Sequence, residues 1–152
     1  MLKKCYLFVF TVSVLILVDQ YIKMLFVNGF RLPGECISLV LAYNKGVAFS
    51  MLSFLEGNLK YIQIAILSAG SIYLLFNKEI FIQYTLALSL LYAGGLSNIY
   101  YRFIHIGVVD YVYWHCGFDF AIFNLADVLI DIAIVLILWI SYQNEKIAKK
   151  DS

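Results

Sequence analysis

The stretch that decides the fold is Gly107–Asp131, which reads GVVDYVYWHCGFDFAIFNLADVLID. Asp110 lies in a run of β-branched and aromatic residues, and such a run predicts an extended segment rather than a helix. Asp127 follows near the start of the last long apolar stretch, where an ionised carboxylate is costly and is usually functional or paired. We therefore expect Asp110 and Asp127 to face each other as a catalytic pair.

The composition is that of an integral membrane protein. Of 152 residues, 63% are hydrophobic and only 14% are charged, whereas a soluble domain carries about 25% charged residues. A net charge of +1 without a basic stripe predicts no nucleic-acid partner. The apolar residues form four long blocks, so we predict one all-α membrane domain, residues 1–152, with four transmembrane helices at about residues 5–26, 61–76, 80–99 and 121–142.

The distribution of basic residues predicts the orientation of these spans. One side would hold a dense set of lysines in few residues: Lys3, Lys4, Lys78, Lys146, Lys149 and Lys150. Because lysine and arginine concentrate on the cytoplasmic side, we expect both termini in the cytoplasm, with a cytoplasmic tail at 143–152 and outer segments at 27–60 and 100–120. Strand-like and turn residues in the first outer segment predict a small sheet on the membrane surface. At about 1.5 Å per residue, Asp19, Asn98 and Asp127 then converge near the outer leaflet.

Two neighbouring carboxylates cannot both ionise easily, so they would share a proton. The charged member could accept a proton from an attacking water while the neutral member polarises a peptide carbonyl. The structural alternative is that Asp110 is a solvated loop residue and Asp127 a helix-terminal aspartate favoured by the helix dipole. Asp131, one turn further on the same face, is less expected of a pure helix cap.

Other polar residues admit simpler interpretations. Asp19 and Lys23 are four residues apart and can pair, and a lysine that snorkels to the membrane interface is favoured over direct catalysis. Asn98 and Arg102 have the same spacing and could reach a carboxylate or a substrate carbonyl. The simplest interpretation of Asn44 with Gly46 is a turn. The simplest interpretation of the Gly94-Gly95 pair is close packing between helices.

Serine–lysine chemistry and metal binding are the two alternatives that the residue types allow. Lys23 could be the base of a serine–lysine dyad, but nothing in the sequence places Ser50 or Ser97 beside it. The potential metal ligands match no standard spacing, so we expect no metal and no cofactor: these are His105, His115, Cys36 and Cys116. A disulfide between Cys36 and Cys116 stays open, since both are expected outside the cytoplasm.

Five blocks in order resemble the motifs of bacterial lipoprotein signal peptidases, the signal peptidase II family. They are DQYIK (19–23), YNKGVAFS (43–50), AGGLSNIYYR (93–102), GVVDYV (107–112) and FNLAD (123–127). The resemblance covers nearly the whole chain and implies Asp110 and Asp127 as the catalytic dyad. It implies supporting or substrate-binding roles for Asp19, Lys23, Asn44, Gly46, Asn98, Arg102 and Asn124.

The resemblance also implies an architecture and a substrate. The architecture is four transmembrane helices with a small extracytoplasmic β-cradle and a mobile outer segment, monomeric in the lipid of the bacterial cytoplasmic (inner) membrane. The substrate is a diacylglyceryl-modified prolipoprotein, cleaved before its lipidated cysteine by an intramembrane aspartyl endopeptidase. Three positions depart from the family pattern, and none of them belongs to the implied dyad: Tyr101 replaces a usual Asp, Ala121 a frequent Pro, and Val128 a common Ser.

The alternative function is a non-enzymatic four-span channel or transport subunit with an acidic polar path. Such a path would distribute ionisable residues through the depth of the membrane. The second and third predicted spans instead carry no charge between Lys60 and Lys78 or between Glu79 and Arg102. The sequence therefore favours the enzyme.

Overall fold

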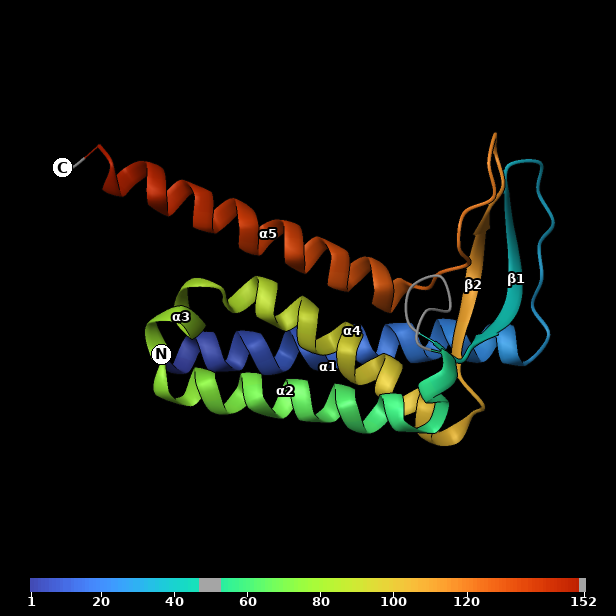
Figure 1. The fold of residues 1–152 in the computed structure, drawn as a ribbon, viewed down its shortest axis with the longest axis horizontal. Helices are drawn as coiled ribbons and strands as arrows, with labels where there is room; N and C mark the ends of the chain where they lie inside the picture. Colours follow the sequence, from blue (N-terminus) through green and yellow to red (C-terminus); the bar gives the residue numbers. More distant parts are fainter. Residues whose placement is uncertain (47–52, 151–152) are drawn as a thin grey trace.

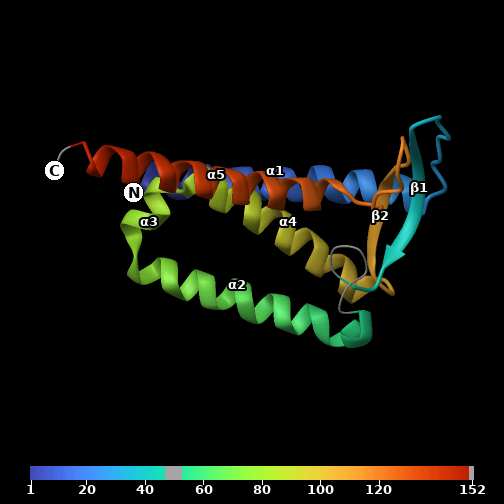
Figure 2. The same ribbon diagram turned by 45° about the horizontal axis from the view of Figure 1, so that its top comes forward.

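A computed structural model describes residues 1–46 and 53–150. The long helices run side by side, and a small sheet lies across one end of them (Figure 1). The start of α1 and the end of α5 both lie at the opposite end from the sheet (Figures 1 and 2). In chain order the elements are α1 (Leu2–Val27), β1 (Ile37–Asn44), the short 3-10 helix η2 (Ser53–Asn58), α2 (Leu59–Phe76), α3 (Lys78–Gln83), α4 (Thr85–Ile104), β2 (Val108–Trp114) and α5 (Leu125–Ala148).

Helix α1 exposes apolar side chains and buries polar ones, the reverse of a helix on a water-soluble protein. In α1 the buried residues are Asp19, Lys23 and Phe26, while most of its large apolar side chains are exposed. Within the described ranges, α1, α2 and α5 are long and apolar enough to cross a membrane. The predicted membrane character is therefore confirmed.

The predicted span at 80–99 is a broken helix in the structure. It is divided at Tyr84 into the short α3 and the longer α4. Helix α4 packs against both α1 and α5, which explains why most residues on its buried face are small or polar. Gly94 marks the closest approach, since a Cβ there would lie 2.4 Å from the main-chain oxygen of Ala126 in α5. The predicted packing role of Gly94 agrees with this geometry.

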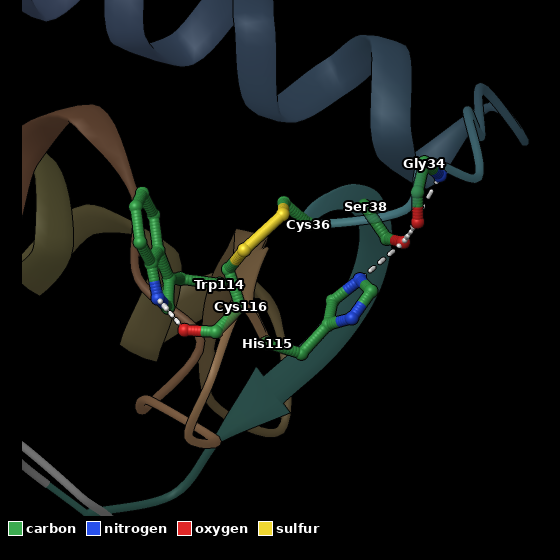
Figure 3. Close-up of a disulfide and its surroundings, with 6 residues drawn as sticks. All are labelled: Gly34, Cys36, Ser38, Trp114, His115 and Cys116. Atoms are coloured by element: carbon green, nitrogen blue, oxygen red, sulfur yellow. Dashed lines mark hydrogen bonds between the residues drawn. A yellow bond between two sulfur atoms is a disulfide. The ribbon is translucent and has the colours of Figure 1, made fainter.

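The sheet joins the two segments that were expected to lie outside the membrane. Strand β1 pairs antiparallel with β2, and Ala42 lies opposite Asp110 in the register. The extended conformation predicted around Asp110 is therefore confirmed. A disulfide joins Cys36 and Cys116 at the far end of this ladder, and beside it the hydroxyl of Ser38 lies 3.0 Å from Nε2 of His115 (Figure 3). The pairing that the sequence left open is thus present.

Helix α5 begins at Leu125, later than the predicted start of the last span at 121. The preceding residues are extended and pair with β2, through hydrogen bonds from Phe123 N to Val112 O (3.0 Å) and from Val112 N to Phe123 O (2.9 Å). Asn124 then caps the helix: its side chain accepts from the Asp127 N–H, and the Asp127 side chain accepts from the Asn124 N–H. This capping box connects the strand that carries Asp110 to the helix that carries Asp127.

Candidate active site

Asp110 and Asp127 line the same cavity, which has a volume of about 410 Å³. One residue, Asn124, is bonded to both carboxylates. Its side-chain Nδ2 donates to Oδ1 of Asp110 at 2.6 Å, and its main-chain N–H donates to Oδ2 of Asp127 at 3.1 Å. Asn124, which lies between β2 and α5, therefore holds Asp110 of the strand and Asp127 of the helix in one site.

Each carboxylate receives a second hydrogen bond from another asparagine. Asn44, at the end of β1, donates to Oδ2 of Asp110 at 3.0 Å. Asn98, on α4, donates to Oδ1 of Asp127 at 2.9 Å. Such bonds fix the orientation of a carboxylate, and they favour its charged form.

Burial acts on the pair in the opposite direction. Asp110 is only 2% exposed, whereas Asp127 is partly accessible from the cavity. Burial, and then the nearby charge of Asp127, raise the pKa of Asp110 to about 6, although the bonds from Asn44 and Asn124 oppose this shift. The cavity therefore holds an acidic group that can carry a proton close to neutral pH.

The structural alternatives are settled by these contacts. Asp110 is not a solvated loop residue, because it lies buried on a strand. Asp127 does take part in a helix cap, so the capping interpretation was correct in part. The same side chain also faces the cavity and Asn98, hence capping and a place in the site are compatible. Asp131 lines the cavity as well.

Asp19 and Lys23 form a buried ion pair at 2.7 Å, and both side chains are fully buried. The prediction that Lys23 snorkels to the interface is therefore wrong, because α4 and β2 pack against α1. Lys23 Nζ donates to Oδ1 of Asn98 at 2.7 Å, so it orients the amide that bonds to Asp127. Asp19 also accepts from the Ala126 N–H in the first turn of α5 at 3.1 Å.

The same contacts decide the serine–lysine hypothesis for one of its serines. Ser97 Oγ donates to Oδ2 of Asp19 at 2.5 Å and accepts from Nε2 of Gln20 at 2.6 Å. Ser97 is therefore a partner of the carboxylate and not of the Lys23 amine. Ser50, the other candidate, lies outside the described residues.

Arg102 anchors the loop that follows β1. Its guanidinium donates to the main-chain oxygen of Gly46 and, at 3.5 Å, to that of Lys45. The Gly46 N–H in turn donates to Oδ1 of Asn44 at 2.9 Å. Arg102 and Gly46 thus help to orient Asn44, which bonds to Asp110. Residues 47–50 of the YNKGVAFS block lie outside the described residues.

Sequence reasoning missed two residues that support the site. The hydroxyl of Tyr111 accepts from the Leu125 N–H at 2.9 Å, and its ring stacks on Phe26 with centroids 4.4 Å apart. Gln63 lines the cavity from α2, and its buried Oε1 has no partner among the described residues. Alternation along β2 could have placed Tyr111 on the face opposite Asp110, but no sequence signal pointed to Gln63.

Tyr101, which replaces the usual Asp, is buried beside the Lys23 ammonium. The Lys23 Nζ lies 5.2 Å from the centre of its ring, and that ring stacks on His105 at 4.9 Å. An aromatic face attracts a cation without carrying a charge of its own. No group of three or more His, Cys, Asp or Glu side chains in the described part of the chain is arranged to hold a metal ion.

The fold and the site together define a membrane protein with two carboxylates lining one cavity at one end of a helical bundle, the arrangement expected of a membrane aspartic peptidase. The family described as "Signal peptidase (SPase) II" matches residues 11–143. The chain belongs to the signal peptidase II family, and the enzyme is thereby favoured over the channel alternative.

Relatives from several bacteria agree with this assignment. The chain is 55% identical to a lipoprotein signal peptidase of Wolinella succinogenes over 85% of its own length and 88% of the relative. It is 50% identical to that of Sulfurimonas denitrificans over 89% of this chain and 87% of the relative. A solved bacterial membrane enzyme is similar in fold, with a TM-score of 0.77 and 26% identity over 91% of this chain and 88% of that one.

Proposed function

We propose that Asp110 and Asp127 are the catalytic dyad of an endopeptidase that removes the signal peptide from diacylglyceryl-modified prolipoproteins, with cleavage just before the lipidated cysteine. The observation that carries this proposal is that both carboxylates bond to Asn124 and line one cavity. The supporting residues are those that hold this pair in place: Asp19, Lys23, Asn44, Gly46, Asn98, Arg102 and Asn124.

The proposed reaction uses one water molecule and one proton shared by the pair. The ionised carboxylate accepts a proton from the water as the water oxygen attacks the carbonyl carbon of the scissile bond. The neutral carboxyl donates a hydrogen bond to the carbonyl oxygen, on which negative charge develops. A proton then passes to the leaving nitrogen as the C–N bond breaks. Because the two groups are coupled, their apparent pKa values belong to the pair.

We further propose that α4, together with α1, α2 and α5, crosses the bacterial cytoplasmic membrane, with both termini inside and the sheet outside. The start of α1 and the end of α5 lie at one end of the bundle, which supports placing both termini on one side of the membrane (Figure 1); the density of lysines near the termini favours the cytoplasmic side. The carboxylate pair then lies at the depth of the outer leaflet, where a diacylated cysteine presents its scissile bond while its acyl chains remain in the bilayer. We expect a monomer to suffice, because this chain supplies both carboxylates.

The test is signal-peptide release from a diacylated prolipoprotein by the purified protein. We expect Asp110→Asn and Asp127→Asn to abolish release while both variants insert and fold. Asp119→Asn is the matched control, because this exposed residue of the same stretch bonds to the Tyr113 hydroxyl at 2.6 Å and does not line the cavity. Processing by either dyad variant at the rate of the control would refute the assignment.

A further inference from the structure

A second cavity, here called the basic pocket, lies where the end of β1, the start of α2 and the end of α4 meet. Its volume is about 300 Å³. The described residues that line it are Lys45, Gly57, Lys60, Arg102, His105, Ile106 and Gly107. Arg102 also lines the cavity of the carboxylate pair, so the two cavities are neighbours with opposite charge.

The described lining of the basic pocket has cationic side chains and no acidic one. Among the side chains that the structure describes, no carboxylate forms an ion pair with Lys60 or Arg102. The charges of Asp110 and Asp127, in the neighbouring cavity, act on Arg102 without direct contact. The Lys60 ammonium instead lies over the rings of Phe103, at 4.7 Å, and Tyr61, at 5.4 Å.

Arg102 carries an unused donor. Two of its terminal N–H groups donate to the main-chain oxygens of Lys45 and Gly46, whereas its buried Nε has no hydrogen-bond partner among the described residues. A buried guanidinium donor without an acceptor is costly. Anchoring the loop accounts for the terminal N–H groups of Arg102, but it accounts neither for Nε nor for the position of Lys60.

The surroundings of the basic pocket are apolar and exposed. Phe54 is 80% exposed and Ile106 72%, and Tyr61 and Phe103 are each more than half exposed. These residues lie where α2 begins and α4 ends, and both helix ends are on the side of the molecule that carries the sheet (Figure 2). Aromatic and apolar side chains beside cations are typical of the border between lipid and water.

We propose that the basic pocket binds a phosphate anion, and that its source is the headgroup of an anionic phospholipid in the outer leaflet. The positively charged side chains of the pocket complement the negative charge of a phosphate, and Lys60 and Arg102 can donate hydrogen bonds to its oxygens. The exposed apolar side chains favour a lipid over a soluble phosphate, because acyl chains can cover them. This site is separate from the carboxylate pair and does not depend on the proposed catalytic roles.

The experiment measures binding of phosphatidylglycerol to the detergent-solubilised full chain by native mass spectrometry. Lys60→Gln removes one cation of the pocket, and we expect it to weaken binding about fivefold. Lys78→Gln is the matched control, since Lys78 follows the opposite end of α2 and we expect wild-type affinity. Asp127→Asn removes a negative charge beside Arg102 and should bind phosphatidylglycerol at least as tightly as the wild type, which separates this proposal from the catalytic one.

Two further ligands identify the chemistry. Diacylglycerol with the same acyl chains lacks the phosphate, and its binding should be insensitive to Lys60→Gln. Inorganic phosphate should bind more weakly than phosphatidylglycerol; binding of equal strength and with the same dependence on Lys60 would assign the pocket to a soluble anion and refute the lipid source. The proposal is overturned if Lys60→Gln binds phosphatidylglycerol as the wild type does, or if Lys78→Gln loses as much affinity.

Discussion

Replacing Asn124 by alanine tests whether one asparagine holds both carboxylates in the geometry that the reaction needs. The substitution removes the 2.6 Å hydrogen bond from Nδ2 to Asp110. It also removes the side-chain oxygen that accepts from the Asp127 N–H at 3.0 Å and caps α5. The main-chain bond from Asn124 to Asp127 stays available. The two losses act on different properties, so they can be measured separately.

The magnitudes follow from the type of each bond. A hydrogen bond to a charged group is worth about 1.5–3 kcal/mol, and if this is lost in the transition state, kcat/KM falls by about 10- to 150-fold. Loss of the helix cap costs about 1 kcal/mol of stability. Asn124 is fully buried, so solvent cannot replace either bond without rearrangement.

Asn124→Ser is the matched control, because serine is a good helix cap but has no amide to donate to Asp110. We expect both variants to lose peptidase activity, measured as signal-peptide release, and only Asn124→Ala to lose thermal stability in detergent. Activity of Asn124→Ala within twofold of wild type would contradict the positioning role. Activity restored in Asn124→Ser would assign the loss to the helix cap instead.

Two further predictions concern charge and packing. The pKa of Asp110 is raised to about 6, above the ordinary value near 4, so ionising this carboxyl destabilises the folded protein. The thermal midpoint should therefore rise as the pH falls from about 7 to 5. Asp110→Asn should lack the part of this rise that comes from protonation of Asp110. An identical pH dependence in both proteins would contradict it. Gly94→Ala places a Cβ against the main chain of Ala126 and should cost about 1–3 kcal/mol, whereas Gly95→Ala meets only a methyl of Leu67 at 3.2 Å and should cost less. Equal midpoints for the two variants, measured by thermal unfolding in detergent, would argue against a tight α4–α5 contact.

Much of the site could be predicted because its residues stand out against an apolar background. A carboxylate or an ammonium is so costly in lipid that Asp19, Lys23 and Asp127 required an explanation from the sequence alone. The run of β-branched residues around Asp110 marked β2 for a similar local reason. The spacing of Asp19 and Lys23 predicted that they could pair, and they do. What the sequence could not supply was their depth and their other partners: Lys23 was expected at the interface, yet it lies inside the bundle and bonds to Asn98.

The sequence by itself determined that this chain is a membrane protein, where its long apolar segments lie, and which acidic residues are exceptional there. Those properties follow from the local composition of each segment and the spacing of its apolar residues, which do not depend on the other segments. Only the tertiary structure decided that Asn124 bonds to both carboxylates, that Cys36 pairs with Cys116, and that Lys60 and Arg102 line one basic pocket. These contacts join residues from different elements, so they depend on how helices and strands pack and not on any one stretch of sequence.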